Sequence, residues 1–425
     1  MMQDKQSKPL SDIKVPWWLS PHGLCLGFLI PMIFLIWGFG SLDSSTFTMR
    51  THVYLDSYYI MLALLVVLIC AVSAWMGSKI SIGIPSVEAG NVNNALRALG
   101  YIAVLAYIYW FKELLFNPIN IVHIFTGEGL SRRDIGMTQG ITSLVNFTPI
   151  FVSIYIYARF IAKLKLSFDV FLLFIAIILL TLLRVFAWAE RLAFIEILIP
   201  FALLATRQGA FDRFRFVKFF VTAGPFAGLP ILVLYFGLAE FFRSWNAPVY
   251  AGKTGFWEFA LGRIAAYYYT SLNNGAGMLS TLPWPTFEFE NVLNWVHKFP
   301  VLGGIFTHYV DMKNLSIGLF LSRYGDDEFN NPSGVYSVIL DLGLPLGFVY
   351  FAITAFIAGL LFRGYLRGHF VSVVLYPAFF IMLLEIFRYP YLGTSRAFTG
   401  FIGMIIAYII VKGDFGNVRK TPETH

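Results

Sequence analysis

The sequence predicts an all-α, polytopic integral membrane protein with about ten transmembrane helices and one large external loop. Its 425 residues are 58% hydrophobic and only 13% charged, and the mean hydropathy is +0.70. Soluble globular domains carry about 25% charged residues. Apolar windows recur along the chain at lengths suited to a bilayer core of roughly 30 Å. A helical membrane protein is therefore the expected fold class.

The expected spans follow one another with short connections, except for one long interruption before the eighth span. The polar start of the chain has no small-residue cleavage site after its first apolar run, so we expect no removable signal peptide. The ten predicted spans are Leu24–Gly40, Ser57–Met76, Leu99–Phe116, Ile141–Ile161, Asp169–Phe186, Arg191–Ala205, Val217–Leu238, Val335–Phe362, His369–Phe387 and Ala397–Val411.

The fifth and sixth spans come from one apolar stretch, Asp169–Ala205, that is too long for a single crossing at about 1.5 Å per residue. Its middle contains Arg184, Glu190 and Arg191. Ionisable residues are costly inside a bilayer and usually functional. We therefore predict two helices that meet at a turn near Ala187 to Glu190, with the arginines at the tip.

Basic residues in the even-numbered connections determine the expected topology. By the positive-inside rule they place both termini in the cytoplasm. The hairpin tip then faces outward, as do the loops Asn117–Gly140, Phe242–Gly334 and Arg388–Arg396. The chain divides into membrane helices in 1–241, an external loop with amphipathic helices in 242–334, and further helices with a cytoplasmic tail in 335–425. The inside set is Lys79, Arg97, Lys163, Lys165, Arg207, Arg213, Arg215, Lys218, Arg363 and Arg367.

The predicted external side is also basic, and its cations are mostly arginine. Arginine binds phosphate or carboxylate with a planar fork and stays charged when partly desolvated. An anionic ligand outside the membrane is one interpretation; the other is that each arginine reaches lipid headgroups or pairs with an acid such as Glu190 or Glu385. The external arginines are Arg50, Arg132, Arg133, Arg184, Arg191, Arg243, Arg263, Arg323, Arg388 and Arg396.

The long external loop is rich in aromatic residues, which suit either stacking on sugar rings or the aromatic belt of a membrane protein. Within it, Gly255–Ser271 is expected to form a helix along the membrane interface. The loop also holds His308, whose unperturbed pKa of about 6.5 suits proton transfer. The acidic residues Asp326, Asp327 and Glu328 could bind a cation, act as a general base or form a solvated loop.

One further acid, Asp341, lies inside the eighth predicted span, where a bare carboxylate is unfavourable. Gly343 and Pro345 should kink or break the helix beside it. We expect Asp341 to pair with an arginine or to cap the broken helix. The two cysteines, Cys25 and Cys70, fall in predicted spans and offer no disulfide framework or thiol-rich metal site.

Three patches resemble the Wzy-type oligosaccharide repeat-unit polymerases. TLLRVFAWAERLAFIEILIPF resembles the arginine-led central helix of that family, with Arg191 as the closest match and Arg184 as the second. GRIAAYYYTSLNNG, which contains Arg263, Tyr268 and Asn273, is similar to the segment that opens its large periplasmic loop. NNPSGVYSVILDLGLPLG, which contains Asn331, resembles the stretch that closes the loop. The patches cover a small part of the chain, but their order and the loop placement agree with the family.

The resemblance implies a GT-C-like glycosyltransferase of the bacterial inner membrane. Such an enzyme joins undecaprenyl-diphosphate-linked repeat units at the periplasmic face, for O-antigen, capsule or a related polysaccharide. No metal or other cofactor is expected. The implied partners are the lipid-linked oligosaccharides, membrane lipids and a chain-length regulator, and no nucleic acid is expected.

Roles for individual residues follow as hypotheses. Arg184 and Arg191 would clamp the donor diphosphate, and Arg132, Arg133 or the Arg388–Arg396 loop would help to hold a lipid. A base, either His308 or an acid among Asp326, Asp327 and Glu328, would accept the proton of the acceptor hydroxyl. The wider substrate-binding set adds Arg263, Tyr268, Asn273, Arg323 and Asn331.

Two other functions compete with the polymerase. An O-antigen ligase shares the lipid donor and the outer loop, but its loop typically has a catalytic histidine followed closely by asparagine, and here Tyr309 follows His308. A flippase or transporter of the same lipids usually shows inverted repeats and a polar site at the bilayer midplane. This chain instead concentrates its polar residues on one outer side.

Overall fold

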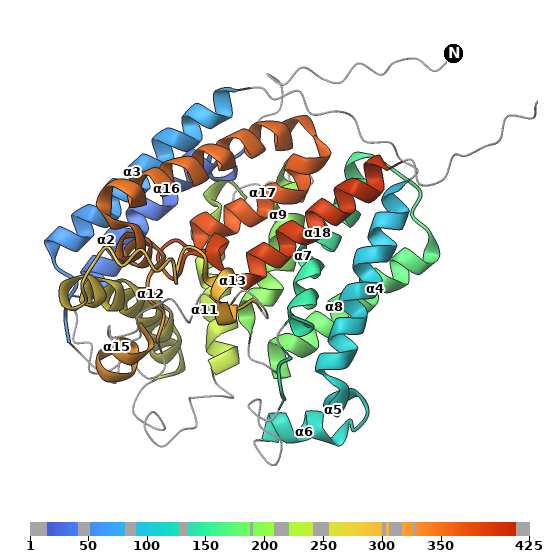
Figure 1. The fold of residues 1–425 in the computed structure, drawn as a ribbon, viewed down its shortest axis with the longest axis horizontal. Helices are drawn as coiled ribbons and strands as arrows, with labels where there is room; N and C mark the ends of the chain where they lie inside the picture. The colour runs from blue at the N-terminus through green and yellow to red at the C-terminus, as the bar shows by residue number, and fades with distance from the viewer. Residues whose placement is uncertain are drawn as a thin grey trace, which may run out of the picture.

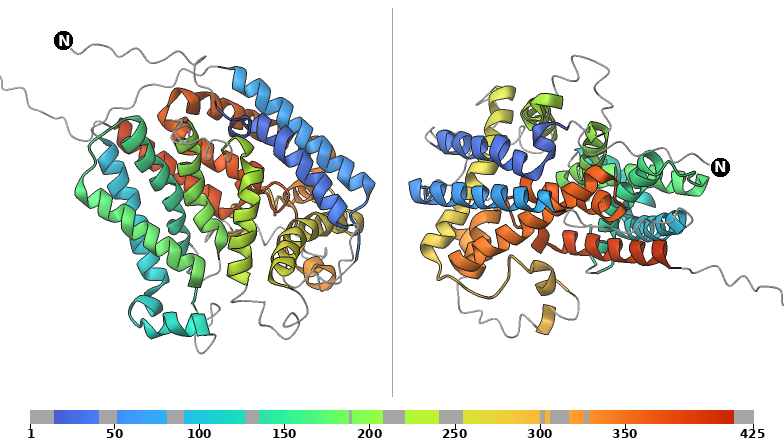
Figure 2. Two further views of the ribbon diagram at one scale, coloured as in Figure 1. Left: turned by 180° about the vertical axis from the view of Figure 1, so that it is seen from behind. Right: turned by 90° about the horizontal axis from the view of Figure 1, so that it is seen from above.

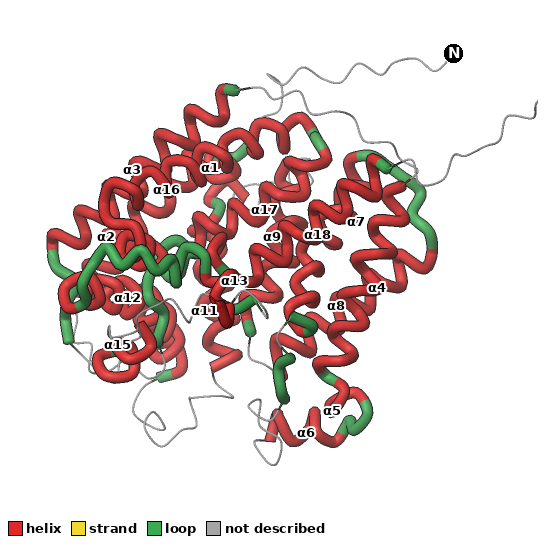
Figure 3. Tube along the Cα trace, viewed as in Figure 1, coloured by secondary structure: helices red, strands yellow, loops and turns green. Residues whose placement is uncertain are grey.

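The computed structural model describes residues 15–40, 52–80, 91–126, 135–138, 140–187, 190–207, 221–240, 255–299, 303–305, 317–325 and 329–413. Throughout these ranges the regular structure is helical, with no strands (Figure 3). Six of the described helical segments are long and apolar enough to cross a membrane: Pro21–Gly38, Ser57–Lys79, Thr142–Ile161, Phe168–Ala187, Gly334–Arg367 and Ser395–Lys412. The predicted class, a helical membrane protein, agrees with this architecture. Each of the ten predicted spans overlaps a described helix, although six meet these criteria of length and composition.

The first half of the chain forms short helical turns and six longer helices. A short 3₁₀ turn, η2 (Trp17–Leu19), precedes the N-terminal span. The span itself is continuous but changes from α to π and back over α1 (Pro21–Leu24), η3 (Cys25–Leu29) and α2 (Ile30–Gly40). The other elements are α3 (Ser57–Lys79), α4 (Val92–Trp110), α5 (Lys112–Leu115), α6 (Ile119–Thr126), η6 (Thr142–Phe147), α7 (Thr148–Ile156), η7 (Tyr157–Ile161), α8 (Phe168–Ala187) and α9 (Arg191–Arg207).

The second half contains the longest helix, α16, and the two helices that follow it. These elements are α11 (Pro225–Glu240), α12 (Phe256–Thr281), α13 (Asn294–His297), α15 (Ile317–Tyr324), α16 (Gly334–Arg367), α17 (Phe370–Leu384), η9 (Tyr391–Gly393) and α18 (Ser395–Lys412).

The helices enclose two main hydrophobic cores, and α17 lies between them. One core joins the N-terminal span with α3, α12 and α16. The other joins α4, α7, α8, α9 and α18. Side chains of α17 enter both, with Val373 in the first core and Val374 in the second. Figures 1 and 2 show α3 beside α16 on one flank and α4 with α8 on the other.

Glycines allow a close contact between α3 and α16. A Cβ atom on Gly77 would lie 2.1 Å from the carbonyl oxygen of Phe356, and one on Gly359 would lie 2.1 Å from that of Ala74. Small residues let helix backbones approach closely where hydrophobic driving force between helices is weak, as in a bilayer. This pair therefore packs with its backbones close together along one flank of the molecule.

The predicted break in the eighth span is confirmed. Gly343 has a φ of 74° and a non-helical conformation inside α16, two residues before Pro345. Asp341, however, does not pair with an arginine. Its carboxylate accepts hydrogen bonds from the backbone N–H of Asn291 and of Val292, so it holds the loop between α12 and α13 against the kink.

The helix expected at Gly255–Ser271 differs from the prediction in its end and in its surroundings. It starts at Phe256 and continues to Thr281. Its second half is almost entirely buried, because Asn273 and Asn274 bind backbone groups of neighbouring segments. Satisfied polar side chains can be buried, and α12 therefore packs against α2, α11 and α16 as part of the bundle.

Candidate functional site

The predicted hairpin between the fifth and sixth spans is confirmed: α8 ends at Ala187 and α9 begins at Arg191. Arg184, in the last turn of α8, is only 5% exposed. Its Nε donates to Glu190 Oε2 at 2.5 Å, and both Nη atoms lie within 3.4 Å of Asn146 Oδ1. The guanidinium also lies 5.2 Å from the ring centroid of Trp110. The hairpin thus holds the Arg184 side chain inside the protein.

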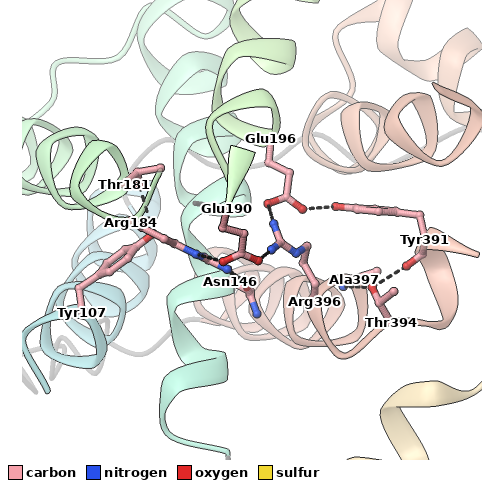
Figure 4. A network of polar contacts seen from close by, with 10 residues as sticks. All are labelled: Tyr107, Asn146, Thr181, Arg184, Glu190, Glu196, Tyr391, Thr394, Arg396 and Ala397. Carbon is pink, nitrogen blue, oxygen red and sulfur yellow. Dashed lines mark hydrogen bonds and ion pairs between the residues drawn. The ribbon is translucent and has the colours of Figure 1, made fainter. Parts of the chain in front are cut away.

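A second arginine reaches the same point from the other end of the chain. Arg396, in the first turn of α18, contacts Glu190 and also pairs with Glu196 Oε2 at 2.5 Å. Glu196, on α9, accepts a further hydrogen bond from the Tyr391 hydroxyl at 2.8 Å. Figure 4 shows the resulting chain of contacts from Arg184 through Glu190 and Arg396 to Glu196 and Tyr391. We call these five residues and Asn146 the hairpin cluster.

Local helix chemistry explains why Arg396 points there. The Thr394 side chain accepts a hydrogen bond from Ala397 N at 3.3 Å and so caps the start of α18. A Thr cap fixes where a helix begins. Because Arg396 is the second residue of the helix, its side chain leaves α18 at the end that faces α9.

The hairpin cluster has balanced formal charge, with two arginines against two carboxylates. Glu196 is 1% exposed, while the Glu190 side chain is 25% exposed. Buried charges need partners of this kind because desolvation costs several kcal/mol per ion. Pairing with acids, the second interpretation of the external arginines, is therefore realised for Arg184 and Arg396. Glu190 is the more accessible carboxylate, so it is the one that an incoming anion could replace.

A second ion pair flanks the same connection between α17 and α18. Arg388 Nη1 lies 2.5 Å from Glu385 Oε2, and its Nη2 contacts the Tyr267 hydroxyl. The guanidinium lies 4.1 Å from the Tyr267 ring centroid. Burial disfavours the charged form of Arg388, but Glu385 outweighs it and raises the arginine's pKa. Arg388 is thus paired with a glutamate, as are the arginines of the hairpin cluster.

Two aromatic rings connect these two sites. Tyr389 follows Arg388, and its ring centroid lies 6.5 Å from that of Tyr391, which binds Glu196. The connection between α17 and α18 therefore joins two buried arginine–glutamate sites through neighbouring tyrosines. Its arginines, Arg388 and Arg396, both belong to the predicted external loop.

The remaining described candidates lie on α12, on α15 or just before α16. The guanidinium of Arg263 lies 4.4 Å from the Phe329 ring centroid and is 3% exposed. Asn273 Oδ1 accepts from the backbone N–H of Tyr54 and of Leu55, which gives it a role in packing.

Three further candidates lie in more open or less specific surroundings. Tyr268 is partly buried against the first core. The carbonyl of Asn331 accepts a hydrogen bond from Asn274 Nδ2. Arg323 is exposed on α15. The structure therefore gathers Arg184, Arg388 and Arg396 around the hairpin and the α17–α18 connection, and leaves Arg323 on the surface.

Other predicted residues lie outside the described part of the chain, and their roles stay predictions. They are Arg132, Arg133, His308, Asp326, Asp327, Glu328 and the side chain of Arg191. Among the described residues, no three histidine, cysteine or acidic side chains gather in a way that could hold a metal.

Several residues of the site do not stand out in the sequence. Glu196 had a usable signal, because it is a lone acid inside an apolar run, where ionisable residues are usually functional. No such signal in the sequence marks Asn146, Tyr391 or Tyr267, since polar or aromatic residues of these types are common in the chain. Their importance appears only when distant helices meet.

Comparison with other proteins adds no further constraint on the site. No family model matches the chain, and no curated protein or solved structure matches it. The hairpin cluster, the flanking Arg388 pair and the sequence patches are the observations from which a function can be argued.

Proposed function

We propose that this protein is an oligosaccharide repeat-unit polymerase of the bacterial inner membrane, resembling the Wzy-type enzymes. In this proposal it is a GT-C-like glycosyltransferase with about ten membrane spans and both termini in the cytoplasm. It joins undecaprenyl-diphosphate-linked repeat units at the periplasmic face. The observation that carries the proposal is the hairpin cluster, in which Arg184 and Arg396 share Glu190.

The position of these arginines supports an anionic ligand at the outer surface. Arg184 is at the hairpin tip, and Arg388 and Arg396 flank the α17–α18 connection. The positive-inside rule assigns the tip and this connection to the same side of the membrane. These arginines, far apart in the sequence, therefore lie on the side of the membrane to which the proposal assigns the lipid diphosphate.

Charge exchange gives the site a means of binding a diphosphate. Arg184 and Arg396 both contact Glu190, the partly exposed carboxylate. Phosphate oxygens make charge-assisted, often bidentate contacts with arginine. A donor diphosphate would take the place of the Glu190 carboxylate. The ion pair with Glu196 would keep Arg396 in its orientation. Arg191 begins α9 beside Glu190, and in the proposal it adds a third cation.

The proposed reaction needs positioning more than covalent help. A hydroxyl of the acceptor repeat unit attacks the anomeric carbon of the donor, the bond from that carbon to the diphosphate oxygen breaks, and the diphosphate leaves with the electron pair. Fixed cations stabilise the charge that develops on this leaving group. The hydroxyl proton goes to a base, for which His308, Asp326, Asp327 and Glu328 are the candidates.

Removal of the protein from its bacterial host tests the proposal against both alternatives. Loss of a polymerase leaves single repeat units on the final acceptor. Loss of a ligase leaves long chains on the carrier lipid, and loss of a flippase traps single units on the cytoplasmic side. The proposal expects the first result, read from a gel of the surface polysaccharide and from carrier-lipid analysis. Either of the other two results would contradict it.

Point variants then test the arginines. Arg191→Ala should abolish long chains while single units are still made, because it removes a cation that the proposal places on the donor diphosphate. Arg184→Lys keeps the charge but loses the planar fork, so it should also shorten chains. Arg97→Ala is the matched control, since Arg97 pairs with Asp169 at the other end of α8. Near-normal long-chain polymer with Arg191→Ala, at equal protein abundance in the membrane, would contradict the proposal.

A further inference from the structure

A second group of basic residues lies at the other end of α17, around its connection with α16. Arg363 and Arg367 are in the last two turns of α16, and Arg207, at the end of α9, donates from Nη2 to the carbonyl of Leu366 at 2.9 Å. Two residues, Gly368 and His369, connect α16 with α17, and Gly368 has a φ of 77°. The hairpin cluster lies beyond the opposite, C-terminal end of α17.

This connection borders a cavity with a volume of about 120 Å³. A water molecule needs roughly 10–15 Å³ measured in this way, so the cavity has room for a group of several heavy atoms. Its polar lining is formed by Arg363, Arg367 and Ser372. We call these three residues and the cavity the α16–α17 pocket.

Buried polar atoms at the pocket have unused hydrogen-bonding capacity. Ser372 is 1% exposed and lines the cavity, yet within the described residues its hydroxyl has no hydrogen-bond partner. Arg363 Nε, in the same lining, and His369 Nδ1, near Ser372, also have no hydrogen-bond partner within the described residues. A buried polar group without a partner costs about 1–3 kcal/mol. Several such groups beside one cavity indicate that a polar ligand completes the site.

The first turn of α17 adds donors of the same kind. His369 is the N-cap residue of this 15-residue helix, and its side chain makes no capping hydrogen bond. The amide groups of a helix N-terminus favour an anion. Ser372 lies in that first turn and packs against Gly364, where a Cβ atom would lie 2.0 Å from its hydroxyl oxygen. Glycine at position 364 therefore leaves the space that the serine occupies.

The apolar part of the lining identifies the chemical class more closely. Ile357, Leu360 and Leu361 line the pocket within the two turns that precede Arg363. They share one face of α16, because residues three and four apart are neighbours on a helix. The pocket thus has apolar side chains next to cationic ones. In a phospholipid an apolar acyl chain likewise lies next to an anionic phosphate, so the two arrangements match.

We propose that the α16–α17 pocket binds a phosphate group, with Arg363, Arg367 and the Ser372 hydroxyl as its donors. The phosphate can belong to the headgroup of an anionic lipid or to free phosphate, and the apolar lining favours the lipid. The site is independent of the proposed polymerase activity. If the proposed topology holds, it faces the cytoplasmic leaflet.

Binding to the purified full chain, after removal of co-purified lipid, tests the proposal. Native mass spectrometry would compare dioleoyl phosphatidylglycerol with dioleoylglycerol, which has the same acyl chains but no phosphate. We expect saturable binding of the phosphatidylglycerol only. The double variant Arg363→Gln/Arg367→Gln should raise the dissociation constant for phosphatidylglycerol roughly tenfold or more. A loss of this size is typical when charge-assisted hydrogen bonds are removed. Ser372→Ala should weaken binding by a smaller factor with no change in folding.

The control is Arg159→Gln, which removes one exposed arginine from the nearby element η7 and should leave binding unchanged. Inorganic phosphate at millimolar concentration distinguishes the two sources. If it displaces phosphatidylglycerol and itself raises the thermal unfolding midpoint, free phosphate is a ligand of the pocket. Equal binding of phosphatidylglycerol and dioleoylglycerol, or unchanged binding by both pocket variants, would overturn the proposal.

Discussion

Two regions of the molecule bury carboxylates in different ways. In the hairpin cluster, Glu190 and Glu196 face the guanidinium groups of Arg184 and Arg396. At the kink of α16, Asp341 is 1% exposed and has no cation beside it among the described residues. It is satisfied by N–H donors of Asn291 and Val292 at 2.8 to 2.9 Å.

The difference separates a site that can exchange its ligands from one that holds the scaffold. A carboxylate paired with arginine can be replaced by another anion, since the cations remain to bind it. A carboxylate held by backbone N–H groups fixes the position of a loop. That loop leads into α13, whose Trp295 ring stacks on Phe398 of α18 at a centroid distance of 3.7 Å. Asp341 therefore acts on the hairpin cluster only through the loop.

The largest effect is expected from Arg396→Ala. It removes the cation shared by Glu190 and Glu196. Within the described residues, the buried Glu196 then keeps the hydrogen bond from the Tyr391 hydroxyl and the longer-range attraction of Arg184, but no ion pair. Breaking a buried ion pair from one side costs about 3–5 kcal/mol because the remaining charge is uncompensated. The free energy of unfolding in mixed micelles, compared with the wild type, measures the loss.

An exposed ion pair in the same bundle provides the control. The side chains of Arg97 and Asp169 are 41% and 37% exposed, and they lie 2.6 Å apart. Exposed pairs contribute little to stability because water screens them, so Arg97→Ala should leave the free energy of unfolding nearly unchanged. Equal losses for Arg97→Ala and Arg396→Ala would show that burial of the hairpin cluster has no energetic consequence.

A smaller effect is expected from Asp341→Ala. This change removes both carboxylate oxygens and leaves the N–H donors of Asn291 and Val292 without their acceptor. Leaving buried donors unsatisfied costs about 1–3 kcal/mol. Hydrogen–deuterium exchange should become faster at the amides of residues 291 and 292, while the amides in the middle of α3 stay protected. Unchanged exchange in the loop would contradict the role given to Asp341.

The sequence predicts the local features of this fold well. Apolar periodicity and the charged tip locate the turn between α8 and α9, and Gly343 with Pro345 locates the kink of α16. These features depend on neighbouring residues alone. The end of α12 is less predictable, since Asn273 and Asn274 become compatible with burial only through partners in distant segments.

The sequence predicts which arginines belong to the site, but not which acids they pair with. Arg184, Arg388 and Arg396 are recognisable as unusual external arginines, whereas their partners are set by the packing of distant helices. Arg396 and Glu196 are 200 residues apart in the sequence. Neither charge alone specifies which acid and which arginine meet. The contact depends on α9 and α18 both packing against α17.

The smallest effect, and the most informative for the proposed function, is expected from Glu190→Gln. This change keeps the shape of the side chain but removes the charge that competes with a donor diphosphate for Arg184 and Arg396. Because the Glu190 side chain is 25% exposed, the gain should be about 1 kcal/mol. The KM for the lipid-linked repeat unit should therefore fall a few-fold in a polymerisation assay with purified protein. Stability should change less than in Arg396→Ala, since Glu196 still holds Arg396. A raised KM would instead mean that Glu190 orients the two arginines for the diphosphate, so that its charge helps binding.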